Sequence, residues 1–199
     1  MKEIIRPAFE SVLTRYVKAR TEAVFRKENP VRGAFEKAVE AIREHVGVKK
    51  PGSVIVRWSV GRGRWAMVPW IAALNTRETR KMDEGVYVIY LFRADMSGVY
   101  LTLNQGISGG NVGLLHARRS ASVLRTRCTG LKDLGFTVDA GIDLRSKVHL
   151  VKGYESATVA YKLYERREVP SDTALLGDLA NLLRTYEALI PSRRIVGVL

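Results

Sequence analysis

A short loop combines residue types that suit contact with a flat, negatively charged partner. Two arginines alternate with two glycines, and all three tryptophans of the chain lie within or beside the loop: Gly61, Arg62, Gly63 and Arg64, with Trp58, Trp65 and Trp70. Apolar stretches typical of buried strands stand on both sides of it. Arginine pairs with anionic groups and stacks on flat rings, so the loop predicts a surface for such a partner.

The charge balance indicates the same kind of partner. The chain has 33 lysines and arginines against 20 aspartates and glutamates, which gives a formal net charge of +13. Such an excess attracts polyanions, with nucleic acid first and an acidic membrane second. The alternative is that the charge only keeps the protein soluble and identifies no partner.

The histidines and the single cysteine do not have the spacing of a metal site. His45, His116 and His149 fall in different segments, without the short intervals that metal ligands need. Cys128 lies on the apolar stripe of a predicted helix, which favours a small buried residue.

Two other segments resemble catalytic motifs only in part. Residues 106–113 read GISGGNVG before a predicted helix but lack the Gly-Lys-Ser/Thr ending, which excludes a nucleotide P-loop. Their backbone N–H groups suit a phosphate, although a plain connector is the simpler interpretation. Asp139, Asp143 and Lys147 lack the spacing of a metal-dependent nuclease and are better explained as solvated turn residues. We therefore predict a chain that is not an enzyme and has no cofactor.

Length and composition favour one domain. With 199 residues the chain is long enough for a full core, and we expect the domain to span 1–190, with 191–199 as a linker or tail. One cysteine allows no internal disulfide, and no apolar run is long enough to span a bilayer. The N-terminus lacks the apolar core of a signal peptide, so a cytoplasmic location is predicted.

Hydrophobic periodicity predicts an α+β fold, with a central mixed, mainly antiparallel sheet flanked by helices. Helices are expected at 7–26, from about 31 to 46, at 114–128, and from the cap Pro170-Ser171-Asp172 up to Pro191. Strands are expected at 54–60, 70–74, 86–92, 99–103 and 158–164, with a hairpin connection at 94–98. Two further short strands are expected around 136–138 and 148–150, and 75–84 is expected to be a loop.

Several stretches together resemble one known family. They are SVGRGRW at 59–65, VPWI at 68–71, GVYVIYL at 85–91, Asp95-Met96-Ser97, YLTLNQG at 100–106, KGYE at 152–155, and Asp178 and Tyr186 of the last helix. Over nearly its whole length, and best between Val54 and Gly106, the chain resembles the N-terminal DNA-binding domain of McrB-type modification-dependent restriction proteins.

The resemblance implies recognition of duplex DNA that carries a modified base, such as a methylated cytosine, by flipping that base into a pocket. It also implies partners: in full-length relatives the domain precedes a GTP-hydrolysing AAA+ motor, which recruits an McrC-type nuclease subunit. This chain itself contains no P-loop. Carried over by position, the pocket residues are Trp70, Tyr87, Leu91 and Tyr154. Tyr154 is expected in a loop. Strand alternation independently places Tyr87 and Leu91 on the same face.

The resemblance further implies that the loop Gly61-Arg62-Gly63-Arg64 enters the duplex. A base-flipping relative has a tyrosine where this chain has Arg62, so Arg62 acts either as a wedge that fills the vacated stack or as a phosphate contact. Further contacts with the DNA backbone are expected from polar residues around the loop and on outer faces: Arg57, Ser59, Arg77, Arg80 and Arg118.

Two other functions remain open at this point. One is a general DNA- or RNA-binding module whose aromatic residues stack on unpaired bases without flipping. The other is the reader half of a nuclease. The sequence alone does not identify the base or the modification that is read.

Overall fold

Five strands form one sheet in the order of the sequence, β1-β2-β3-β4-β5. They are β1 (Val54–Gly61), β2 (Trp65–Asn75), β3 (Val86–Phe92), β4 (Gly98–Gln105) and β5 (Thr158–Glu165). In this computed structural model, which describes residues 3–49 and 53–190, all four pairings between neighbouring strands are antiparallel. The predicted α+β class is thereby confirmed, and among the described strands the parallel pairing of a mixed sheet is not found.

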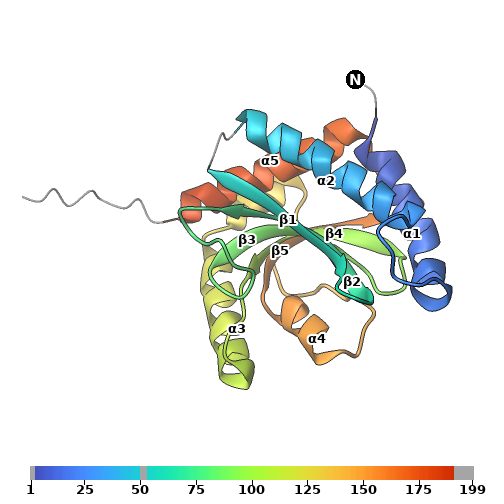
Figure 1. Cartoon of the computed structure of the whole chain (residues 1–199). Helices are drawn as coiled ribbons and strands as arrows, with labels where there is room; N and C mark the ends of the chain where they lie inside the picture. The colour runs from blue at the N-terminus through green and yellow to red at the C-terminus, as the bar shows by residue number, and fades with distance from the viewer. Residues whose placement is uncertain (1–2, 50–52, 191–199) are drawn as a thin grey trace, which may run out of the picture.

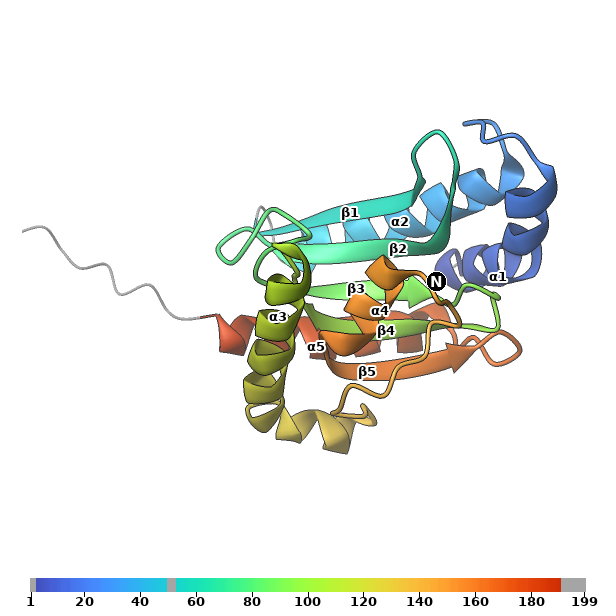
Figure 2. The ribbon, with the colours of Figure 1, turned by 90° about the horizontal axis from the view of Figure 1, so that it is seen from below.

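Helices cover both faces of the sheet (Figure 1). On one face lie α1 (Ile5–Glu22), α2 (Pro30–Lys49) and α5 (Asp172–Leu189), and on the other lie α3 (Gly110–Thr126) and the short α4 (His149–Ser156). Figure 2 looks onto the second face, where α4 lies across the middle strands and α3 stands at one end of the sheet. Much of β1 and β2 on this face is not covered by a helix (Figure 2).

The sheet separates two apolar clusters of unequal size. The larger joins α1, α2 and α5 to the sheet, with Phe9 packed edge-on against Tyr90 and Phe92. The smaller lies under α4 and includes Ile89 and Val151. All seven residues of β3 are buried, because this central strand has apolar partners on both faces, as its unbroken apolar run predicted.

Several sequence predictions differ from the structure, among them the first helix, which ends at Glu22 rather than at residue 26. Helix α3 begins at Gly110, so the glycine-rich segment supplies its first turn, and β2 begins at Trp65 rather than at Trp70. The strand expected at 148–150 is wrong, since these residues lead into α4, and 136–138 contributes a single bridge, Thr137 to Tyr161. The apolar residues at 148 and 150 alternate as in a strand, but the residues from 149 to 156 form a helix. The expected tail, 191–199, lies outside the described residues.

One buried carboxylate joins the two ends of the domain. Helix α1 has no side-chain cap of its own at Ile4. Instead Asp172, at the start of α5, accepts hydrogen bonds from the backbone N–H groups of Ile4 (2.6 Å), Ile5 (3.0 Å) and Arg6 (2.7 Å). The carboxylate thus satisfies donors that a helix N-terminus leaves unpaired, 166 or more residues away in sequence.

We expect Asp172→Ala to lower the free energy of unfolding by roughly 2–4 kcal/mol, because buried N–H groups lose a charged acceptor. Urea unfolding followed by circular dichroism measures the change. Asp133→Ala is the matched control, since Asp133 is an exposed carboxylate on the short 3₁₀ helix η1 (Thr129–Leu134). Equal stability of the two variants would contradict the capping role.

Candidate functional site

A cleft of about 840 Å³ opens beside the turn between β1 and β2. The end of α1 and the start of α4 form its other sides. The residues that give it chemical character are Arg62, Arg64, Trp65, Trp70, Leu150 and Tyr154. It therefore combines a basic rim with aromatic walls, where the β1–β2 turn meets the end of α1 and the start of α4.

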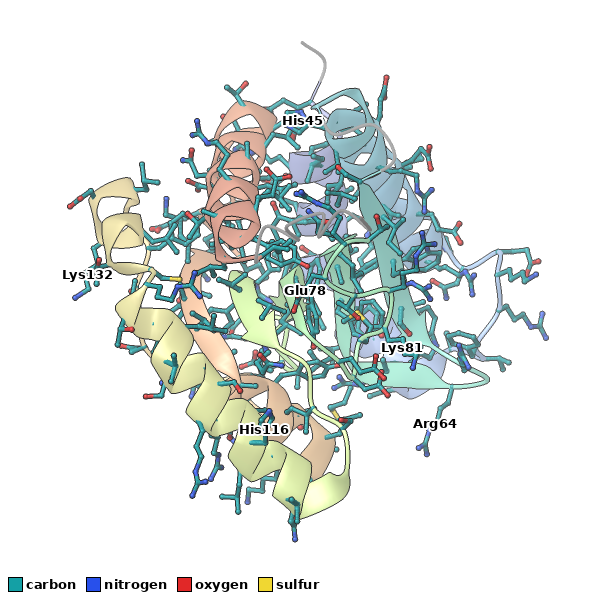
Figure 3. The ribbon with its side chains drawn as sticks, turned by 90° about the vertical axis from the view of Figure 1, so that its left-hand side faces the viewer. His45, Arg64, Glu78, Lys81, His116 and Lys132 are labelled. Carbon is teal, nitrogen blue, oxygen red and sulfur yellow. The ribbon has the colours of Figure 1, made fainter. Side chains whose placement is uncertain are left out.

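The shape of the β1–β2 turn depends on Gly61. Its φ is +119°, and a Cβ at this position would lie 1.9 Å from the carbonyl oxygen of Arg64, so no other residue fits without a change in the backbone. The register shifts between Ser59 and Gly61, and the N–H of Gly61 donates to the Ser59 Oγ at 3.1 Å. The turn therefore exposes Arg62 and Arg64, and Arg64 projects outward from it (Figure 3).

The three tryptophans beside this turn have different positions. Trp58 packs against the larger core, with the Arg32 guanidinium 5.3 Å from its ring. Trp65 is 8% exposed, and its Nε1–H donates to the Ala23 carbonyl at 3.2 Å, which joins the hairpin to the end of α1. Trp70 is half-buried on the opposite face and belongs to the smaller cluster. Trp65 and Trp70 therefore both reach the cleft, whereas Trp58 does not line it.

The four predicted pocket residues do share one face. Trp70, Tyr87, Leu91 and Tyr154 all belong to or pack against the smaller cluster, and Trp70 is the cross-strand partner of Leu91. Trp70 and Tyr154 line the cleft. Tyr87 and Leu91 are 1% and 0% exposed and lie in the buried layer of the same cluster.

Burial affects the two tyrosine hydroxyls of this group. It raises the pKa of Tyr87 well above its ordinary value, and the nearby Tyr154 and Asp83 raise it further. Burial also raises the pKa of Tyr154. A phenol is protonated at neutral pH even at its ordinary pKa, so these shifts keep both hydroxyls protonated, with an O–H to donate, into more alkaline solution.

Tyr154 lies in α4, which corrects the predicted loop. Its backbone is held by a buried polar network: the Tyr154 carbonyl accepts hydrogen bonds from Asn104 Nδ2 at 2.9 Å and from the Thr158 hydroxyl at 3.0 Å. Asn104 Oδ1 in turn accepts from the hydroxyls of Thr102 and Thr158. These contacts fix the end of α4 on β4 and β5, so the position of Tyr154 does not depend on its ring alone.

The predicted backbone contacts divide into three places. Ser59 lines the cleft, and the exposed Arg57 lies two residues away on the same face of β1. Arg77 and Arg80 lie in the connection between β2 and β3, at the end of β2 opposite the Gly61 turn. Arg118 is apart from these, because its guanidinium donates to the Ser156 hydroxyl and joins α3 to the end of α4.

Several residues at the cleft were not identified from the sequence. The guanidinium of Arg20 donates to the carbonyls of Met67 and Ala94 and thereby holds α1 against the sheet. Val148 and Leu150 line the cleft at the start of α4 although they are 44% and 72% exposed. The signal for this pair was the apolar alternation at 148–150, which we interpreted as a strand.

The acidic residues considered for metal chemistry stabilise turns. Asp139 accepts from the N–H of Gly141, and Asp143 accepts from the N–H of Arg145. Over residues 3–49 and 53–190, no three His, Cys, Asp or Glu side chains are grouped as metal ligands. Burial raises the pKa of the Cys128 thiol, as suits a core residue. No helix of the described chain has both the length and the apolarity to cross a bilayer.

Comparison with protein families gives one match. The family described as the MrcB-like, N-terminal domain matches residues 11–191, which is nearly the whole chain. None of the curated proteins compared with the chain matches it.

We expect Gly61→Ala to destabilise the hairpin by roughly 1–3 kcal/mol, because the added Cβ meets backbone that must move. Gly63→Ala is the matched control. Gly63 also has a positive φ, +66°, but a Cβ there meets nothing within 4 Å, so its cost is limited to roughly 1 kcal/mol of backbone strain. Thermal unfolding of both variants measures the two losses of stability. A larger loss of stability in Gly63→Ala than in Gly61→Ala would contradict this account of the turn.

Proposed function

The chain belongs to the MrcB-like, N-terminal domain family, and from this premise we propose that it binds duplex DNA carrying a modified base and flips that base into the cleft. The family supports a DNA-recognition module of the McrB type. The proposal of base flipping depends on one observation: the arginines of the β1–β2 turn line the same cleft as Trp70 and Tyr154.

The cleft has the chemistry that an extruded base requires. A flipped base stacks between apolar or aromatic walls and is read by a few polar groups at its edge. Trp70 and Tyr154 supply aromatic walls, and Leu91 packs beneath Trp70 as its cross-strand partner. The protonated hydroxyl of Tyr154 supplies an uncharged donor at the cleft. The volume of about 840 Å³ lies within the ordinary range for ligand sites.

The strands beside the cleft suit a duplex that lies along them. Strand β2 has 11 residues and spans roughly 33 Å at about 3.3 Å per residue. One turn of duplex DNA repeats after about 34 Å. Arg62 and Arg64 at one end of β2 and Arg77 and Arg80 at the other are thus spaced to meet the backbone about one turn apart, with Arg57 between them.

In the proposed system this chain recognises the DNA, while catalysis belongs elsewhere. A GTP-hydrolysing AAA+ motor and an McrC-type nuclease subunit are the proposed partners, as the family relationship suggests. Their contribution does not bear on how the base is read, so the isolated chain is the proper material for a binding test.

A panel of duplexes that differ in one base tests this function. It contains cytosine, 5-methylcytosine and 5-hydroxymethylcytosine at one position, with the fluorescent analogue 2-aminopurine beside it. We expect tighter binding to one modified duplex, together with brighter fluorescence as the stack opens. Equal affinity for all duplexes without a fluorescence change would instead support general nucleic-acid binding.

Within that panel, Tyr154→Leu should lower affinity for the preferred modified duplex about ten- to a hundredfold, since stacking of a base on an aromatic ring contributes about 1–3 kcal/mol. Leucine retains apolar contact with the cluster, so binding to unmodified duplex should change little. Tyr161→Leu is the control, because Tyr161 packs on the same cluster from β5 and does not line the cleft. Unchanged discrimination in Tyr154→Leu would remove this residue from the pocket.

We expect Arg62→Ala to weaken binding to modified and unmodified duplexes by similar factors, as loss of a phosphate contact requires. The slope of log K against log salt should become shallower by about 0.9 for the one lost phosphate. Titrations at several salt concentrations measure both effects. Arg167→Ala, an exposed arginine after the far edge strand β5, serves as control. A loss confined to modified duplex would show that Arg62 fills the vacated stack.

A further inference from the structure

An exposed leucine stands on the rim of the cleft opposite the basic turn. Leu150 is 72% exposed, and Val148, two residues before it, is 44% exposed. Both line the cleft that Arg62 and Arg64 border from the other side. The start of α4, where these residues lie, is the end of that helix nearest β2 (Figure 2).

Packing of the protein itself does not account for Leu150. The buried residues of α4 are Val151, Gly153 and Glu155, which attach the helix to the sheet. Leu150 precedes this buried side and belongs to neither apolar cluster. A leucine so exposed carries a cost in water, since burial of such a side chain is worth about 1.5–3 kcal/mol. Its position at a cleft makes it a candidate contact for a ligand.

The segment that presents Leu150 is firmly supported. The N–H of Leu144 donates to Glu155 Oε1 at 2.8 Å, and the Leu144 carbonyl accepts from Ala94 N at 2.9 Å. The Arg93 side chain donates to the Asp143 carbonyl at 3.1 Å. Hydrogen bonds from α4 and from the β3–β4 turn therefore fix the position of residues 143–144, which lead into the helix that carries Leu150.

We propose that Leu150, with Val148 beside it, is the apolar wedge that enters the base stack when the modified base leaves it. The proposal rests on the function proposed above and adds a second DNA-contacting rim to it. An apolar side chain inserted between base steps replaces lost stacking contacts, which an arginine does less well. Arg62 on the opposite rim then serves the phosphates.

Charge around the leucine favours the same partner. Arg145 and Lys147 are exposed in the residues just before it, and Arg62 and Arg64 are exposed across the cleft. An apolar tip between cationic groups matches a duplex, whose stacked bases lie between two anionic backbones. The occupant we assign to this rim is therefore the duplex at the step beside the flipped base.

The test compares Leu150→Ala, Leu150→Met and wild type on the preferred modified duplex and on its unmodified counterpart. Loss of the wedge should lower affinity of Leu150→Ala for modified duplex about five- to thirtyfold, within the range that base stacking contributes. The fluorescence rise of 2-aminopurine beside the modified base should fall with it. Methionine keeps length and apolar surface, so Leu150→Met should restore most of both signals.

Two controls separate a wedge from a merely exposed side chain. Leu115→Ala removes a leucine that is 57% exposed on α3, away from the cleft, and should bind as wild type does. A duplex with a mispaired modified base is already partly unstacked, so Leu150→Ala should lose less affinity there. Thermal unfolding should be the same for all variants, because each of these positions is exposed.

The outcomes distinguish this inference from the function on which it rests. If wild type prefers modified DNA and unstacks it while Leu150→Ala does the same, the wedge is overturned and the proposed function stands. Equal losses on modified and unmodified duplex also overturn the wedge, since they indicate a flanking contact. If wild type neither prefers modified DNA nor opens the stack, the proposed function fails and the wedge fails with it.

Discussion

The register between β1, β2 and β3 is the constraint on which the rest of the structure depends. Ser59 pairs with Trp70, and Trp70 pairs with Leu91, so one row of side chains crosses three strands on the face that carries α4. A slip by one residue would move that whole row to the other face. Two features oppose a slip: β3 is buried on both faces, and the turn at Gly61 admits one backbone path. The same register that packs the core therefore also sets the positions of Ser59 and Trp70 in the cleft.

The sequence predicted most of the sheet because its strands have strong local signals. The unbroken apolar run at 86–92 indicated a central strand, and the alternation at 54–60 indicated a strand with Arg57 and Ser59 on one face; the structure adds that this strand is at the edge. That Tyr87 and Leu91 lie on the same face of their strand followed from the alternation of side chains along a strand alone. The glycines of the turn marked its place, although the close approach of Gly61 to the Arg64 carbonyl depends on tertiary geometry that periodicity does not contain.

Helix α4 could not be predicted by the same reasoning. It has eight residues, and the apolar residues at its start, Leu150 and the preceding Val148, alternate as in a strand. What makes the segment helical is its surroundings: Glu155 binds the N–H of Leu144, and Asn104 with Thr158 binds the carbonyl of Tyr154. Of these contacts, the one from Asn104 joins residues 50 apart in sequence, which local periodicity does not reveal. The same limit applies to the tryptophans, whose proximity in sequence concealed that Trp58 and Trp70 lie on opposite faces.

In the proposed function, the cleft divides recognition of DNA between forces of different range. Arginines on the turn and beyond β2 act over about a Debye length, roughly 8 Å at physiological salt, and attract any duplex regardless of its bases. Discrimination would come from short-range contacts, for which the cleft provides the rings of Trp70 and Tyr154 and the uncharged Tyr154 hydroxyl. A buried phenolate would repel the anionic ligand, whereas a neutral phenol donates a hydrogen bond without that cost. In the proposed function, cations on outer turns and uncharged groups within the cleft thus allow strong general attraction without weakening selectivity for one base.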